Sequence, residues 1–322
     1  MAARRITPGL LRRSATRAWA SDRPLALLVA LMLPTLAVCA IGLAIDPDVI
    51  TGAPAWLKPA KFSVSIAIYG ATLLWLLTLV EGHRRLVMSI GAVTALALGV
   101  EQVIIVGAVV LDTTSHFNFS TPAHTAAWST MGASIVAVWV MNLLAIVLLL
   151  RQRLTSRAFA WSLRLGLAAS FVGMGLAFLM TSPTPEQLAL AEAGRGLPIS
   201  GAHSVAVADG GPGLPLVGWS TVGGDLRAAH FVGLHGLQVL PLVGWLLVRL
   251  RAPWLGEAHR SALVAVAGSS YIAVVAALTW QALRGQSLIA PDAWTLAALG
   301  AILALAGVAG VCVLAHARRR SV

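Results

Sequence analysis

Long apolar runs alternate along the chain with short polar connections. Eight of the runs reach or exceed the roughly 20 residues that a helix needs to cross the hydrocarbon core of a bilayer. The pattern predicts an all-α fold, a polytopic transmembrane helical bundle of about eight spans. The predicted spans are residues 25–45, 62–81, 86–111, 126–150, 158–180, 227–248, 261–283 and 294–316.

The composition supports insertion in a membrane. The 322 residues are 58% hydrophobic and only 11% charged, and the mean hydropathy is +0.85. A typical soluble domain carries about 25% charged residues. The lipid bilayer is therefore the main expected partner. We interpret the first run as an uncleaved span, because it is too long for the apolar part of a typical signal peptide.

Basic residues are distributed unevenly between the two sets of connections. Seventeen arginines lie before span one, in every second connection and after span eight, whereas the other connections hold five lysines and arginines. The positive-inside rule then places both termini in the cytoplasm. Because the charges cluster at span ends, the net charge of +11 does not indicate nucleic-acid binding. We expect a basic N-terminal segment (1–24), a single transmembrane domain (25–316) and a basic tail (317–322).

The connections on the expected outer side are longer and more varied than the inner ones. The longest of them, residues 181–226, is rich in glycine and proline. We predict an irregular lid there, with one short helix near residues 185–193. Loops on a rigid scaffold commonly carry binding sites, so we expect any small-molecule ligand to approach from the outer side.

Span six begins with an unusual concentration of polar residues. Asp225 is well placed to cap the helix. At about 100° per residue, Arg227, His230, His235 and Gln238 then share an arc of about 140°, and the opposite face is apolar and rich in glycine. We expect these four side chains to point into the bundle, and the opposite face to meet lipid or to pack closely on another helix. The alternative is that they are structural polar residues that hold helices together.

Span three carries a second polar stripe. Thr94, Glu101 and Asp112 fall within about 20° of one line along the helix. Glu101 and His235 each lie about 15 Å below the outer end of their spans, so the two side chains could pair.

Two further spans contribute residues to the expected pocket. Tyr69 and Tyr271 are the only tyrosines and lie within spans two and seven. We expect spans two, three, six and seven to line one pocket that opens outward. Lys58 and Lys61, just outside span two, either reach to the membrane surface or attract an anionic ligand.

Histidines are concentrated on the expected outer side, at His116, His124, His203, His230 and His235. Imidazoles bind transition metals, and a haem b group can take one histidine from each of two helices. We consider His116, His124, His230 and His235 as possible ligands. The spacings match no standard metal motif, and His230 and His235 differ by about 140° around their helix. Hydrogen-bonded structural or proton-handling histidines are the alternative.

Three segments carry a resemblance to known sequences: "WLKPAKF", "EQVIIVG…SHFN" and "GDLRAAHFVGLHGLQVLP". They resemble a family of bacterial polytopic inner-membrane proteins with no assigned activity. The similarity covers most of the chain after about residue 50. It implies a multi-pass protein of the bacterial inner membrane, and it assigns no role to any residue.

Three functions remain open from the sequence. The first is a redox or metal-handling protein, in which His230, His235 and His116 hold haem or a metal. The second is a small-solute or proton-coupled transporter, in which Glu101 and His235 titrate while Lys58 and Arg227 guide an anion. The third is a non-catalytic assembly or sensor protein. No Walker A, HExxH or clear G-x-S-x-G motif points to a particular enzyme.

Overall fold

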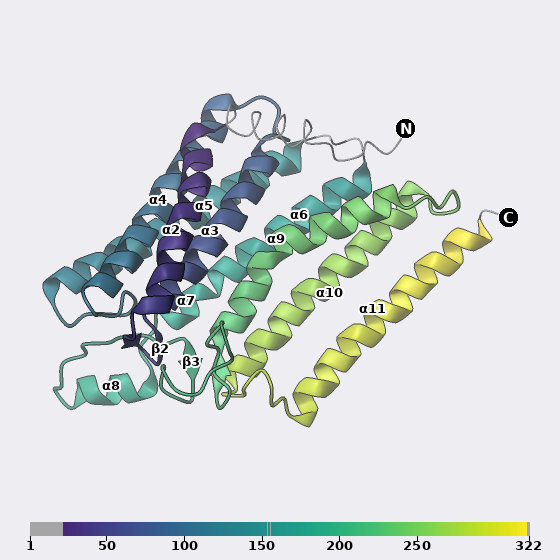
Figure 1. Cartoon of the computed structure of the whole chain (residues 1–322). Coiled ribbons are helices and arrows are strands. Elements are labelled where there is room, and N and C mark those ends of the chain that lie inside the picture. The colour runs from purple at the N-terminus through teal and green to yellow at the C-terminus, as the bar shows by residue number, and fades with distance from the viewer. Residues whose placement is uncertain (1–21, 153, 155, 321–322) are drawn as a thin grey trace. The chain divides into compact units, whose positions relative to one another are not determined.

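The computed structural model describes residues 22–152, 154 and 156–320 (Figure 1). Among these residues, eight helices are long and apolar enough to cross a membrane, which confirms the predicted helical bundle. The protein is therefore a multi-pass integral membrane protein. The long helices are α2 (Arg23–Ile45), α3 (Leu57–Leu77), α4 (Arg84–Val110), α5 (Pro122–Arg151), α6 (Arg157–Gly175), α9 (Leu226–Arg249), α10 (Glu257–Leu283) and α11 (Ala293–Arg319).

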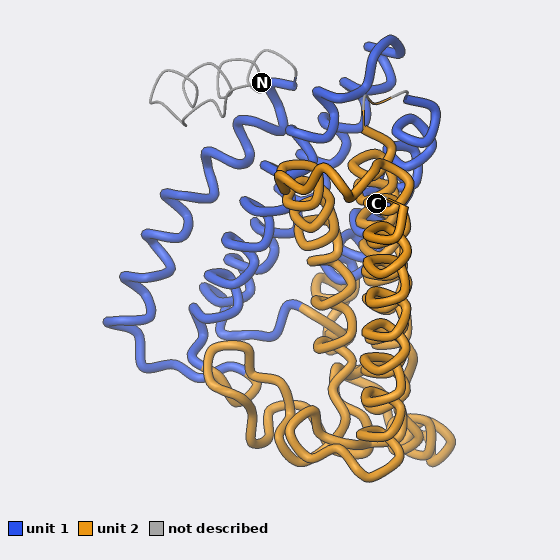
Figure 2. The backbone as a smooth tube through the Cα atoms, turned by 90° about the vertical axis from the view of Figure 1, so that its right-hand side faces the viewer, with its two compact units in different colours: residues 1–50, 54–115, 126–152 blue, residues 51–53, 116–125, 153–322 orange. Residues whose placement is uncertain are grey.

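The chain divides into two compact units, coloured separately in Figure 2. Unit 1 consists of residues 1–50, 54–115 and 126–152, and unit 2 of residues 51–53, 116–125 and 153–322. Of the predicted basic ends, residues 1–21 and 321–322 lie outside the described residues. Helix α11 continues to Arg319, so the first part of the predicted tail is helical.

Unit 1 is built on α2, α3 and α4. Helix α2 packs on both α3 and α4, and α3 packs on α4. Asp22 caps α2 by accepting a hydrogen bond from the backbone of Leu25, and its carboxylate lies directly on Gly91 of α4. A side chain at position 91 would occupy the place of this carboxylate, so the glycine permits the contact.

Unit 2 is built on α6, α9, α10 and α11. Helix α6 packs on α9, and α10 packs on α6, α9 and α11. The α6–α9 contact is close: a Cβ added to Gly173 would lie 2.6 Å from the carbonyl carbon of Gly233. Gly244 likewise faces Ser162. The prediction that the glycine face of span six can pack closely on another helix is confirmed.

The long connection after α6 is mostly irregular, as predicted. It contains α7 (Ala177–Met180) and α8 (Pro185–Glu192), and α8 confirms the expected short helix. Strand β3 (Ser204–Val205) pairs antiparallel with β4 (Gly224–Asp225), and β1 (Val49–Ile50) and β2 (Ala53–Pro54) lie after α2. The sequence does not reveal these strands, because two residues are too few to show an alternating pattern.

Two local predictions are wrong. Helix α3 begins at Leu57 and not near residue 62, so Lys58 and Lys61 are part of the helix. Pro59 is tolerated there, because the first helical turn leaves its N–H groups without intrahelical partners. Asp112 lies beyond the end of α4 in a left-handed conformation (φ 47°), so it does not extend the stripe of Thr94 and Glu101.

Candidate functional site

The apolar helix α4 carries one buried carboxylate side chain among its described residues. Glu101 is 1% exposed and lies about 14 Å along the axis from the end of the helix. Lys58 of α3 is close enough for its charge to act on this carboxylate. An ionisable group inside a membrane helix is costly unless another group compensates it, which makes the pair a candidate site.

The neighbouring residue fixes the register between α3 and α4. Gln102 donates hydrogen bonds from Nε2 to the Pro59 carbonyl (3.2 Å) and to Ser63 Oγ (3.0 Å). Ser63 Oγ in turn donates to the same Pro59 carbonyl (2.9 Å). Position 102 of α4 is therefore level with positions 59–63 of α3.

This register extends the polar site along both helices. Helices α3 and α4 run antiparallel. Tyr69 lies about eight residues after position 61 on α3, and Thr94 lies eight residues before Gln102 on α4, so both are at the same depth, about 12 Å from Gln102. Tyr69 shares the stripe of Lys58 on α3, and Thr94 shares that of Glu101 on α4, each within about 20°. We call Lys58, Tyr69, Thr94 and Glu101 the polar stripe of unit 1.

Several atoms of this region are buried without a hydrogen-bond partner among the described residues. They are the hydroxyl oxygens of Tyr69 and Thr94, one carboxylate oxygen of Glu101 and the amide oxygen of Gln102. Each such atom costs about 1–3 kcal/mol relative to a hydrogen-bonded one. A stripe that combines an ammonium group, a carboxylate and two hydroxyls can exchange protons and can hydrogen-bond a small polar solute.

In unit 2, Asp225 and Arg227 stabilise the N-terminal end of α9. Asp225 caps α9, accepting from the Arg227 backbone N–H (3.0 Å), and it also accepts from the Ser220 N–H (2.7 Å). Arg227 binds both oxygens of the same carboxylate and donates to the Gly218 carbonyl (2.7 Å). These contacts occupy the guanidinium, so the structure does not favour Arg227 as an anion guide.

The remaining polar residues of α9 do not all face inward. His230 is half-buried, and its Nδ1 donates to the Gly173 carbonyl of α6 (2.7 Å). His235 is exposed, with only a long contact of 3.4 Å to Gln238. The expectation that all four residues point into the bundle is therefore wrong for His235. The physical reason is that α9 turns its glycine face towards α6.

The two tyrosines differ in their surroundings. The Tyr271 hydroxyl donates to the Val232 carbonyl of α9, so this side chain joins α10 to α9. Of the four helices expected to line one pocket, α3 and α4 pack together in unit 1, and α9 and α10 pack together in unit 2. A pocket lined by all four helices stays a prediction, as does the pairing of Glu101 with His235.

A histidine–carboxylate pair lies in the long connection between α8 and α9 of unit 2. Asp209 accepts hydrogen bonds from the Nδ1 of His203 (2.6 Å) and from the backbone N–H groups of His203 (3.0 Å) and Ser204 (2.8 Å). Burial opposes the ionised carboxylate, but these hydrogen bonds and the His203 charge keep the pKa of Asp209 well below its usual range. This pair has no periodic signal in the sequence, because it lies in irregular backbone.

The histidines considered as ligands do not assemble into a metal centre in the described part of the chain. The His203 ring lies 4.9 Å from that of Phe117 and 6.3 Å from that of His116, between ring centroids. His124 Nδ1 is hydrogen-bonded to Ser120 Oγ (2.8 Å). No group of three or more His, Cys, Asp or Glu side chains within residues 22–152, 154 and 156–320 could hold a metal ion. Binding of haem b or a transition metal stays a prediction without structural support.

Comparisons with protein-family models, with curated proteins and with solved structures gave no match. The resemblance of the three sequence segments to a bacterial membrane family stays a prediction. Within unit 1, Tyr69, Thr94 and Glu101 of the polar stripe each have a buried oxygen without a hydrogen-bond partner among the described residues, and such atoms need an explanation.

Proposed function

We propose that this integral membrane protein is a proton-coupled carrier of a small anionic solute, with Glu101 as the proton-exchanging group. One observation carries the proposal. The Glu101 carboxylate is buried inside a membrane-spanning helix, within electrostatic range of Lys58, and one of its oxygens lacks a hydrogen-bond partner among the described residues. Intramembrane carboxylates of this kind are typical of proton relays in pumps and transporters.

The Lys58–Glu101 pair supplies a physical basis for coupling. When Glu101 is ionised, its negative charge balances the ammonium group of Lys58. When Glu101 takes up a proton, one negative charge is removed from the surroundings of Lys58, and this change favours the binding of an anionic solute. The two charges thus link binding of the solute to binding of a proton. Tyr69 and Thr94 offer hydroxyl groups further along the same stripe.

The proposal is tested with purified protein in liposomes that contain a pH-sensitive dye. Inward gradients of inorganic phosphate and of succinate serve as probes. We expect at least one of the two anions to acidify the lumen in the wild type, and Glu101→Gln to remove this proton uptake. Glu186→Gln, in the exposed helix α8, is the matched control and should behave as the wild type. Proton uptake that persists in Glu101→Gln, or a wild type inactive with both anions, would contradict the proposal.

An absorbance spectrum of the purified protein separates this function from the redox hypothesis. A proton-coupled carrier that works through Glu101 requires neither haem nor a metal, so we expect no Soret band and no stoichiometric metal. A Soret band that disappears in His235→Ala would instead favour haem binding.

We infer that the protein resides in a bacterial inner membrane with both termini in the cytoplasm. The support is the excess of arginines in alternate connections, together with the resemblance of the three segments.

A further inference from the structure

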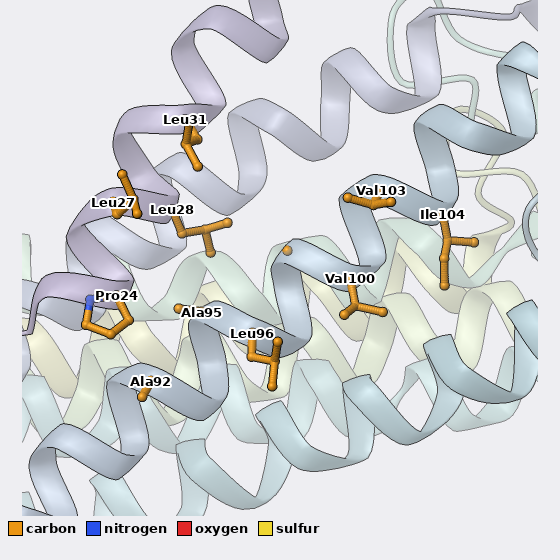
Figure 3. Close-up of a pocket in the computed structure, with 11 residues that line it drawn as sticks. Pro24, Leu27, Leu28, Leu31, Ala92, Ala95, Leu96, Val100, Val103 and Ile104 are labelled. Carbon is orange, nitrogen blue, oxygen red and sulfur yellow. The ribbon is translucent and has the colours of Figure 1, made fainter.

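An apolar groove runs between α2 and α4 on the surface of unit 1 (Figure 3). Its volume is about 540 Å³, and every lining residue is proline, leucine, alanine, glycine, valine or isoleucine. The two helices approach each other where Leu28 faces Gly99, since a Cβ added to Gly99 would lie 3.7 Å from Leu28 Cδ1. Leu31, Leu96 and Val103 line the groove and are 50%, 71% and 72% exposed, so the groove opens outward from the unit.

The dimensions of the groove fit an acyl chain. From Ala92 to Ile104, it extends about 18 Å along α4, and half of a hydrocarbon core of about 30 Å is one leaflet. A helix with its side chains is about 10 Å across. Because α2 and α4 are in contact at Leu28 and Gly99, the space between them suits an extended hydrocarbon chain better than a third helix.

One end of the groove is basic. Arg23 precedes Pro24, which lines that end, and Arg84 and Arg85 begin α4 about 10–12 Å before Ala92. All three arginines are exposed. Two acidic residues lie at this end: Asp22 is buried against α4 and engaged as the helix cap of α2, and Glu81 is exposed three residues before Arg84, so the three exposed arginines outnumber the one exposed carboxylate. The exposed charge at the end of the groove is therefore positive.

We propose that this groove binds an acyl chain of an anionic phospholipid, whose phosphate is held by Arg23, Arg84 and Arg85. Basic residues near a membrane surface attract anionic headgroups, and the apolar lining accommodates the chain. The site lies on the α2–α4 face and does not depend on the proposed transport function.

Native mass spectrometry of the detergent-purified full chain tests the proposal. The probes are phosphatidylglycerol and phosphatidylcholine with identical acyl chains, titrated separately. We expect phosphatidylglycerol to bind more tightly, by about fivefold for each arginine that contacts the headgroup. Arg84→Gln combined with Arg85→Gln should bring the affinities of the two lipids close together. Arg319→Gln combined with Arg320→Gln, exposed at the end of α11, is the matched control and should retain the preference.

A second pair of variants tests occupation of the groove itself. Gly99→Phe should fill the groove and remove the tightly bound lipid. Gly307→Phe introduces the same side chain on α11, where an added Cβ meets nothing within 4 Å, and should leave lipid binding unchanged. Equal binding of the two lipids to the wild type would overturn the proposal. It would also fail if Gly99→Phe retained the lipid, or if this variant converted a lipid-free dimer to a monomer, which would identify the groove as a contact between two copies.

Discussion

Asp225 shows how one residue can serve several structural purposes at a helix end. Its carboxylate caps α9, binds the guanidinium of Arg227 and accepts the Ser220 N–H, while it is itself 2% exposed. The sequence predicts Asp225 as the cap of this helix and Arg227 as a residue that could guide an anion. The structure confirms the cap and places both residues at the junction between the long connection and α9.

We expect Asp225→Ala to destabilise the protein by about 2–4 kcal/mol. The change removes a helix cap and leaves Arg227 half-buried without its carboxylate partner. The measurement is the free energy of unfolding in a denaturing detergent. Asp225→Asn keeps a capping side chain and should cost less. Equal stability of Asp225→Ala and the wild type would show that the pair contributes nothing.

The His203–Asp209 pair predicts that the stability of the connection between α8 and α9 depends on pH. Because the pKa of Asp209 is lowered on folding, its contribution to stability is present above the ordinary carboxyl pKa of about 4 and is lost as the pH falls through the lowered value. Asp209→Asn should remove this contribution at neutral pH. We expect faster amide exchange at His203 and Ser204 in this variant, whereas Glu192→Gln, exposed at the end of α8, should not alter it. Unchanged protection in Asp209→Asn would refute the role of the carboxylate.

At the scale of elements, span lengths and helix caps could be predicted because they depend on local sequence. The eight spans agree with the helices within a few residues at most ends, and the cap at Asp225 and the short helix α8 were predicted from local sequence. The start of α3 was misplaced, because Lys58 and Lys61 reduce the local hydropathy although they are helical. The direction in which α9 faces depends on its partner helix, which hydropathy does not identify.

The α6–α9 contact gives a prediction at this scale. Gly173→Ala should destabilise unit 2 by about 1–3 kcal/mol, because the new Cβ would lie 2.6 Å from the backbone of Gly233 and would force the helices apart. Gly300→Ala on α11 meets no atom within 4 Å and should be neutral or slightly stabilising, by up to about 1 kcal/mol. Detergent unfolding of both variants measures the difference. Equal effects of the two substitutions would argue against close helix packing at Gly173.

At the scale of the whole molecule, the distribution of arginines predicts the topology in the membrane. In a background with both Cys39 and Cys312 replaced by alanine, Glu192→Cys introduces a single cysteine that should react with a membrane-impermeant maleimide in intact cells. A single cysteine at position 319 should react only after the membrane is permeabilised. The opposite labelling pattern would place the termini outside and reverse the predicted orientation.

The sequence by itself determined that the chain crosses a membrane as helices, because hydrophobic length and charge at span ends are local quantities. It also identified Glu101, Lys58 and Tyr69 as polar residues that need an explanation. Only the tertiary structure decided which of the candidate residues have partners. It shows that Arg227 binds Asp225, that Tyr271 donates a hydrogen bond to α9 and that Lys58 lies within electrostatic range of Glu101. Interactions between helices depend on how segments distant in sequence pack against one another.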